Sequence, residues 1–218
     1  MTNGSGDSTR ITVLYDPLCG WCYGATPALR RLVGIAGVHM ELVPTGLFSG
    51  DGARPMDAGF AEYAWANDQR IEQLTGQRFS NRYRTAVLGA QGTKLDSGPA
   101  TMALTAAALA SPGRELDALE AIQAARYVEG RDVTALDVLV DILRSLGLEE
   151  AATLLSDGDS GLVAVVESRT AEARSMLRAV GARGVPAVVA GENSSQRLVP
   201  SEHLYGPLDD LLRHLHAG

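Results

Sequence analysis

The chain has 218 residues, 45% of them hydrophobic, and a formal net charge of −7 at pH 7. A chain of this length and apolar content can bury its own core, as one large domain or two interleaved ones. The acidic balance argues against nucleic-acid binding, because phosphate affinity comes mainly from clustered lysines and arginines. No apolar run approaches the roughly 18 residues that a membrane-spanning helix needs.

The first ten residues, MTNGSGDSTR, are polar and have neither the charged nor the apolar region of a secretory leader. We therefore expect a cytoplasmic protein without a membrane partner. The chain has two cysteines, Cys19 and Cys22. In the cytoplasm a close cysteine pair more often serves catalysis or metal binding than a structural crosslink.

The N-terminal segment predicts a strand, a helix and a second strand. Residues 11–15 are β-branched and aromatic, and Asp16-Pro17 ends this run. Apolar residues then recur at helical spacing over residues 20–35, and residues 38–43 alternate between apolar and polar. A β-α-β unit of this size predicts a parallel pair with a right-handed crossover.

The middle of the chain predicts helices alone, since no convincing strand pattern occurs between about residues 58 and 158. The C-terminal part predicts a long helix, a Gly- and Pro-containing break, two strands joined by a hairpin-type loop, and a closing helix. The predicted helices and strands, in chain order, are helices 57–75, 80–89, 98–110, 114–128, 134–146, 149–156 and 162–180, strands 187–190 and 196–199, and helix 200–216. Strands at both ends predict one α/β sheet with a helical insertion.

Cys19 and Cys22 occupy the predicted junction between the first strand and the first helix. A helix N-terminus offers free N–H groups and a positive dipole end, so it favours a thiolate at Cys19. Cys22 lies one helical turn further, within reach of a mixed disulfide formed at Cys19. This spacing suits an exposed nucleophile followed by a buried resolving thiol.

Two other interpretations of the pair stay open, although the pattern favours neither. A structural zinc site needs a second pair of ligands, and His214 and His216 are spaced too closely for the usual pattern. We therefore predict no metal. A structural disulfide across so short a loop would remove little chain entropy.

Gly184-Val185-Pro186 lies between the long helix and an apolar strand, where a cis-proline can open the strand. An ordinary trans turn proline is the alternative. Together with the CxxC junction, this segment resembles the start and end of a thioredoxin fold. The intervening helical stretch of about 100 residues is similar to that of DsbA-like oxidoreductases.

Two further segments carry this resemblance to the DsbA-like family. YDPLCGWC resembles the D-P-x-C-x-W-C form of cytoplasmic members of the FrnE type, and ARYVEGRDVTALDVL, residues 125–139, resembles a segment of the family's insertion. Pro27 matches the helix-kinking proline of thioredoxins. The resemblance implies a mixed sheet flanked by helices, with a thioredoxin-like domain in two parts, residues 1–58 and 160–218, and a helical insertion domain at 59–159.

The resemblance also implies roles for individual residues. Cys19 would be the nucleophile, Cys22 the resolving thiol and Pro186 a cis-proline facing them. The backbone of Val185 would pair with an extended peptide substrate. Gly20 and Trp21 would shape the rim. Because DsbA itself has Pro-His where this chain has Gly-Trp, we expect a less oxidising couple, within about −270 to −120 mV.

Other residues near the motif have two interpretations each. Asp16 could tune the thiols or accept a proton, or it could be a turn residue. Ser97-Gly98-Pro99 could form a rim loop near Cys19, although a plain helix start is the stronger interpretation. Core packing is favoured over a groove facing the active site for three aromatic residues, Phe60, Tyr63 and Trp65.

The predicted function is thiol–disulfide oxidoreduction or isomerisation on protein or small-thiol substrates, with an unidentified redox partner. It needs no cofactor besides the Cys19–Cys22 disulfide, and glutathione is a candidate co-substrate. One alternative is a glutathione-dependent enzyme of the kappa-class transferase or 2-hydroxychromene-2-carboxylate isomerase type, although those carry a single Ser or Cys. The other is a non-catalytic peptide-binding or chaperone module around Trp21.

Overall fold

A four-stranded mixed sheet forms the centre of the molecule, with its strands in the order β2-β1-β5-β6. The computed structural model describes residues 8–216, so most of the polar start discussed above lies outside the described residues. The strands are β1 (Thr9–Tyr15), β2 (Val38–Pro44), β5 (Ala187–Ala190) and β6 (Arg197–Val199).

The strand pairing confirms a sheet assembled from both ends of the chain. Strand β1 pairs in parallel with β2 and antiparallel with β5, and β5 pairs antiparallel with β6. The register places Val13 between Leu42 and Val188. Strand β5 is therefore an inner strand, and all four of its residues are buried.

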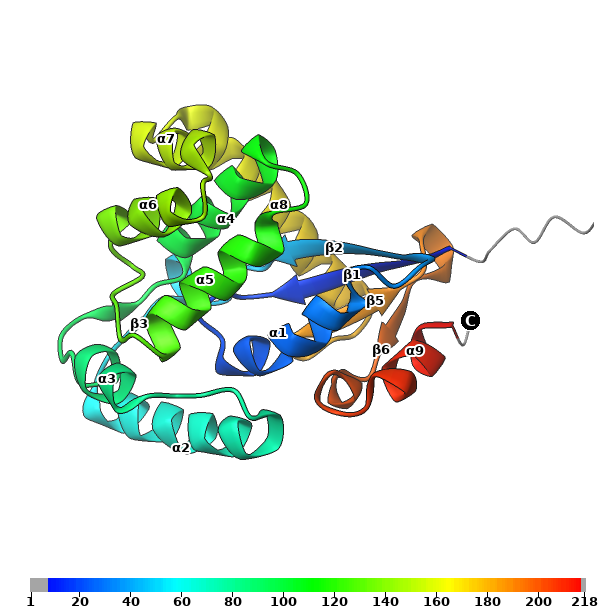
Figure 1. The fold of residues 1–218 in the computed structure, drawn as a ribbon, viewed down its shortest axis with the longest axis horizontal. Coiled ribbons are helices and arrows are strands. Elements are labelled where there is room, and N and C mark those ends of the chain that lie inside the picture. The colour runs from blue at the N-terminus through cyan, green and yellow to red at the C-terminus, as the bar shows by residue number, and fades with distance from the viewer. Residues whose placement is uncertain (1–7, 217–218) are drawn as a thin grey trace, which may run out of the picture.

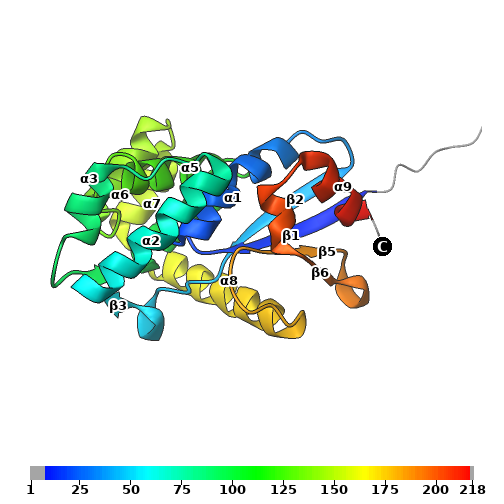
Figure 2. The same cartoon turned by 90° about the horizontal axis from the view of Figure 1, so that it is seen from below.

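Helices cover both faces of this sheet (Figures 1 and 2). Helix α1 (Gly20–Leu32) and helix α9 (Leu208–His216) lie on one face, and α8 (Ser160–Ala179) lies on the other. Successive side chains of a strand point to opposite faces. Leu14 accordingly packs in the small cluster beneath α8, whereas Val13 belongs to the large core on the α1 side.

The remaining helices gather at one end of the sheet (Figure 1). They agree with the periodicity of the sequence, and they enclose most of the large core, including Leu104, Ile122 and Leu139. These helices are α2 (Ala58–Thr75), α3 (Asn81–Tyr83), α4 (Gly98–Ala110), α5 (Glu115–Tyr127), α6 (Leu136–Ser145) and α7 (Glu149–Asp157).

Three local features differ from the prediction. Strand β4 (Lys94–Leu95) contradicts the expected absence of strands between about residues 58 and 158, because two residues are too few for an alternating pattern; it pairs antiparallel with β3 (Arg54–Pro55), which lies before that range. The expected helix at 80–89 continues beyond α3 as a π-helical turn, Arg84–Leu88. The closing helix is interrupted at Gly206, whose extended backbone precedes Pro207.

Candidate active site

Cys19 and Cys22 lie at the junction between β1 and α1, as predicted. Cys19 is the residue before the first turn of α1, and its backbone is extended, with φ −83° and ψ 120°. Its sulfur therefore lies at the end of the helix where N–H groups have no intrahelical partner. Cys19 is 9% exposed and Cys22 only 2%. An incoming sulfur can thus reach Cys19 more easily than Cys22.

The Asp16 carboxylate stabilises the turn before Cys19 through hydrogen bonds. Its Oδ1 accepts a hydrogen bond from the Leu18 N–H at 2.9 Å, and its Oδ2 accepts from the Phe48 N–H at 3.1 Å and the Ser97 hydroxyl at 2.7 Å. The side chain is fully buried, and this burial raises the pKa of Asp16 although the three hydrogen bonds oppose the rise. Of the two interpretations considered for Asp16, these contacts fit the turn role, and Ser97 reaches Asp16 from the residue before α4.

Burial also raises the pKa of the Cys22 thiol well above its usual value. The neighbouring Cys19 sulfur and the Asp16 carboxylate raise the pKa further, because each disfavours a second negative charge nearby. Cys22 is consequently held as a neutral thiol at pH 7, and a proton must leave it before it can attack a disulfide.

The peptide bond between Val185 and Pro186 is cis, the geometry considered for this segment from the sequence. The Cys19 thiol donates a hydrogen bond to the Val185 carbonyl, with 3.6 Å between sulfur and oxygen. Residues 166 positions apart in the chain thus meet at the reactive sulfur. Figure 1 shows why: β5, which follows Pro186, lies directly beside β1.

Trp21 forms one wall of an apolar groove beside the motif. The groove has a volume of about 510 Å³ and is lined by Leu74, Val185, Pro186 and Tyr205 among others. The Tyr205 ring packs edge-on against the Trp21 ring at 5.3 Å, and its hydroxyl donates to the Trp21 carbonyl at 3.2 Å. Trp21 is half-buried. Tyr205 follows no motif, and sequence reasoning missed it.

A second, smaller cavity shares Trp21 with this groove and opens between α1, α2 and α5. Its volume is about 240 Å³, and Cys19, Gly20, Phe60 and Tyr63 line it. Tyr63 is 65% exposed, so the core role favoured for it is wrong. Trp65 does not line the cavity and instead lies against the Arg84 guanidinium, 5.0 Å from the ring centre.

The wall of this cavity holds a buried carboxylate from α2. Asp68 is 5% exposed, and the Tyr83 hydroxyl donates to its Oδ2 at 2.9 Å. Burial raises the pKa of Asp68 to about 7, while the Tyr83 hydrogen bond and the Arg126 charge act in the opposite direction. Gly20 makes room for this carboxylate, since a Cβ on Gly20 would lie 2.5 Å from Asp68 Oδ1.

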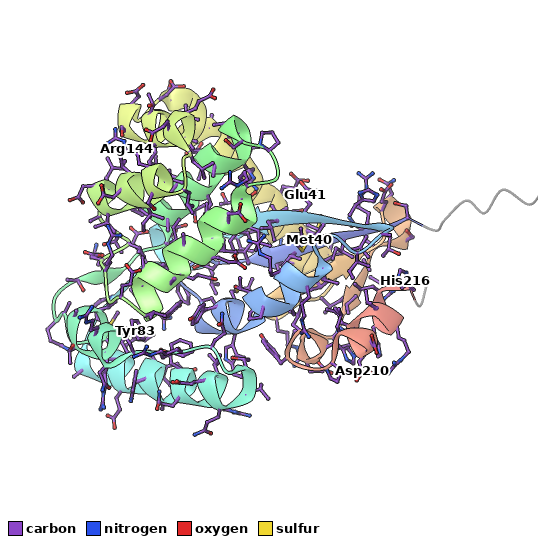
Figure 3. All side chains as sticks on the ribbon, viewed as in Figure 1. Met40, Glu41, Tyr83, Arg144, Asp210 and His216 are labelled. Atoms are coloured by element: carbon purple, nitrogen blue, oxygen red, sulfur yellow. The ribbon has the colours of Figure 1, made fainter. Side chains whose placement is uncertain are left out.

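Arg126 and Tyr127, at the end of α5, complete the same wall. The Tyr127 hydroxyl donates to the Leu18 carbonyl in the cysteine turn at 2.7 Å, which ties α5 to the active site. The guanidinium of Arg126 lies 5.5 Å from the Tyr83 ring centre and 5.6 Å from that of Tyr127. Tyr83, labelled in Figure 3, comes from α3, and its ring centre lies 5.0 Å from that of Tyr127. The only available signal was the segment ARYVEGRD, which contains Arg126 and Tyr127.

Within residues 8–216, no three His, Cys, Asp or Glu side chains lie close enough to hold a metal ion. None of the helices in the same range combines the length and hydropathy needed to cross a bilayer.

Comparisons with known proteins agree with this geometry. The model of the DSBA-like thioredoxin domain family matches residues 10–206. The cytosolic disulfide reductase DsbM from Pseudomonas aeruginosa is 31% identical, with a TM-score of 0.84, and the match covers 96% of this chain and all of that one. A structure of the same protein with GSH gives 31% identity and 0.82, covering 94% of this chain and 96% of that one.

A proposed protein disulfide isomerase from Nitrosomonas europaea shares the fold, with 21% identity, a TM-score of 0.76 and coverage of 96% of this chain and 100% of that chain. Comparison with curated proteins gives no significant match. The family match spans nearly the whole chain, the fold is the expected one, and the CxxC pair occupies the strand-to-helix junction. The chain therefore belongs to the DSBA-like thioredoxin domain family and is a thiol–disulfide oxidoreductase.

Proposed function

We propose that this protein reduces disulfides in the cytoplasm, with Cys19 as nucleophile, Cys22 as resolving thiol and a small thiol such as glutathione as reductant. The observation that carries the proposal is the position of Cys19, which occupies the N-cap position of α1 and donates a hydrogen bond to the carbonyl of Val185. The direction is supported by the whole-length similarity to a cytosolic disulfide reductase, whose structure has also been solved with GSH.

The first half of the cycle reduces the substrate. The Cys19 thiolate attacks one sulfur of the substrate disulfide, and the other substrate sulfur leaves as a thiolate and takes up a proton. Cys22 then loses its proton and attacks the Cys19 sulfur, which releases the second substrate thiol and forms the Cys19–Cys22 disulfide. Asp16 is the proposed acceptor of the Cys22 proton, because it is a buried carboxylate whose charge the Cys22 thiol senses.

The second half of the cycle restores the dithiol. One glutathione thiolate attacks Cys19, and Cys22 leaves as a thiolate that takes up a proton. A second glutathione attacks the glutathione sulfur of this mixed disulfide, which yields glutathione disulfide and frees Cys19. The two electrons given to the substrate are thus replaced by two glutathione molecules.

Polypeptide substrates are proposed to bind in the groove of Trp21, Val185, Pro186 and Tyr205. Its walls are largely apolar, and the backbone of Val185 can pair with an extended segment as in β-strand addition. Residues 59–159 are proposed as an insertion domain that closes the other side of the site.

The two cysteine variants test the catalytic assignment. Cys19→Ser removes the nucleophile, so we expect insulin reduction to fall to the uncatalysed rate. Cys22→Ser leaves the nucleophile in place, so we expect it to accumulate mixed disulfides at Cys19, visible by mass spectrometry. Full insulin reduction by Cys19→Ser would contradict the proposal. Glutathione-conjugating or isomerase activity that survives Cys22→Ala would instead indicate the transferase-type alternative.

A further inference from the structure

The cavity between α1, α2 and α5 has features that the disulfide chemistry itself does not require. It adjoins the apolar groove at Trp21, which lines both hollows, and it contains Cys19 in its wall. Its volume of about 240 Å³ is below the roughly 300–1,000 Å³ of pockets that enclose drug-sized ligands. This size suits part of a small molecule better than a loop of a folded protein.

A buried cation without an ion-pair partner lines this cavity. Arg126 is 3% exposed, and its Nε has no hydrogen-bond partner among the described residues. Within residues 8–216 no carboxylate forms an ion pair with Arg126. Burying a charge without pairing it is costly, so an unpaired guanidinium in a cavity indicates a site for an anion.

Asp68 lies near enough for the charge of Arg126 to lower its pKa, yet it compensates Arg126 poorly. One of its oxygens accepts from Tyr83, and the other lies against Gly20. Because burial raises the pKa of Asp68 to about 7, part of this carboxylate is protonated at neutral pH. The positive charge of the Arg126 guanidinium is therefore not fully neutralised by Asp68 and can attract a bound anion. Its planar donor array matches a carboxylate, which it can bind through two parallel hydrogen bonds.

We propose that this cavity is the subsite for the reducing thiol, and that Arg126 binds a carboxylate of that thiol while its sulfur reaches Cys19. The inference rests on the proposed function, since it names what selects the reductant for the same cysteine pair. The reductant is therefore a small thiol that carries a carboxylate, as amino-acid-derived thiols do. Polypeptide substrates use the adjoining apolar groove at Trp21.

The test compares charged and uncharged thiols on the full-length oxidised protein. Tryptophan fluorescence, to which Trp21 beside the cysteines contributes, follows reduction of the Cys19–Cys22 disulfide by glutathione, by glutathione dimethyl ester and by 2-mercaptoethanol. The readout is the ratio of the second-order rate constants for glutathione and 2-mercaptoethanol, because a general loss of reactivity cancels in it. The wild-type protein is expected to prefer glutathione over its ester by about tenfold after correction for thiol pKa.

Variants at two positions should change the ratio in opposite directions. Arg126→Met removes the cation, so the ratio should fall about tenfold, and Arg126→Lys should restore part of it through charge without the bidentate geometry. Asp68→Asn keeps an acceptor for Tyr83 but removes the competing negative charge, so the ratio should rise.

Equal ratios in Arg126→Met and the wild-type protein would overturn the inference while leaving the proposed function intact. If Arg126→Met does not fold, an unchanged ratio in both Arg126→Lys and Asp68→Asn, together with equal rates for glutathione and its ester, would overturn it. A Cys19–Cys22 disulfide that no thiol reduces, dithiothreitol included, would overturn the proposed function and the inference together.

Discussion

Gly20 brings the insertion helix α2 into contact with the cysteine motif. A methyl group at this position would meet Asp68 Oδ1 at 2.5 Å and Ile71 Cδ1 at 3.2 Å. We expect Gly20→Ala to lower the free energy of unfolding by about 1–3 kcal/mol, because overpacking displaces Asp68 from Tyr83. Urea unfolding measures this loss. Gly206→Ala is the matched control, since no heavy atom lies within 4 Å of its Cβ position. Equal stability of the two variants would contradict the packing argument.

Asp68 should make the stability of the protein depend on pH. Its pKa is about 7 in the folded protein, against 3.8 ordinarily, and burial is the main cause. Between these values the folded state holds a proton that the unfolded state has lost, so the contribution of Asp68 to stability falls as pH rises from about 4 to about 7. Above pH 7 the contribution is constant.

Asp68→Asn removes this dependence and keeps the side chain's shape. The unfolding free energy of the variant minus that of the wild-type protein should rise between pH 4.5 and pH 7.5. Each pKa unit contributes about 1.4 kcal/mol to this difference. Urea denaturation at four pH values measures it, and a difference that stays flat with pH would show that Asp68 is ionised throughout.

At the scale of elements, one buried network joins α8, α5 and β1. Arg169 donates from Nη2 to both carboxylate oxygens of Glu115 at 2.9 Å and to the Leu42 carbonyl at 2.8 Å. The Tyr15 hydroxyl donates to Glu115 Oε1 at 2.9 Å. The network connects the helix beneath the sheet with a helix of the middle region, across the end of the central strand.

We expect Arg169→Met to lower the free energy of unfolding by about 3–5 kcal/mol, because it leaves the Glu115 carboxylate buried and unpaired. The double variant Arg169→Met with Glu115→Gln should lose less, since no unpaired charge remains. The control is Arg144→Met, which removes an exposed pair with Glu149 at 3.7 Å on α6 (Figure 3) and should cost less than 1 kcal/mol. Similar losses for the two arginines would contradict this account.

The sequence predicted elements wherever a periodic pattern ran for several residues. Strand β1 and helix α6 are examples, and the CxxC pair was found because its spacing is local. The Asp68–Tyr83 hydrogen bond and the Arg126 position could not be predicted, because the residues come from different helices and no local pattern connects them. The pKa of Asp68 depends on its burial, which follows from tertiary packing alone.

At the scale of the whole molecule, the reduction potential measures the relative stability of the folded protein with Cys19 and Cys22 as a dithiol and as a disulfide. Cys19 donates to a carbonyl, Cys22 is buried with a raised pKa, and Trp21 stands where DsbA has histidine. No histidine charge stands between the two sulfurs, so we expect a potential well below the about −120 mV of DsbA. Equilibration with glutathione buffers measures it. Trp21→His should raise the potential and Trp21→Phe should not, whereas a wild-type value near −120 mV would contradict the prediction.

The sheet order has a consequence for folding of the enzyme during translation. Strand β5 inserts between β1 and β6 directly after Val185-Pro186, and the Val185 carbonyl meets Cys19, yet this part of the chain is translated more than 160 residues after that cysteine. The nascent chain therefore presents its two thiols long before their final surroundings exist. Such distant pairing also slows folding, because closing a long loop costs entropy before the contacts form. The cysteine pair thus acquires its final surroundings late, once the last quarter of the chain has left the ribosome.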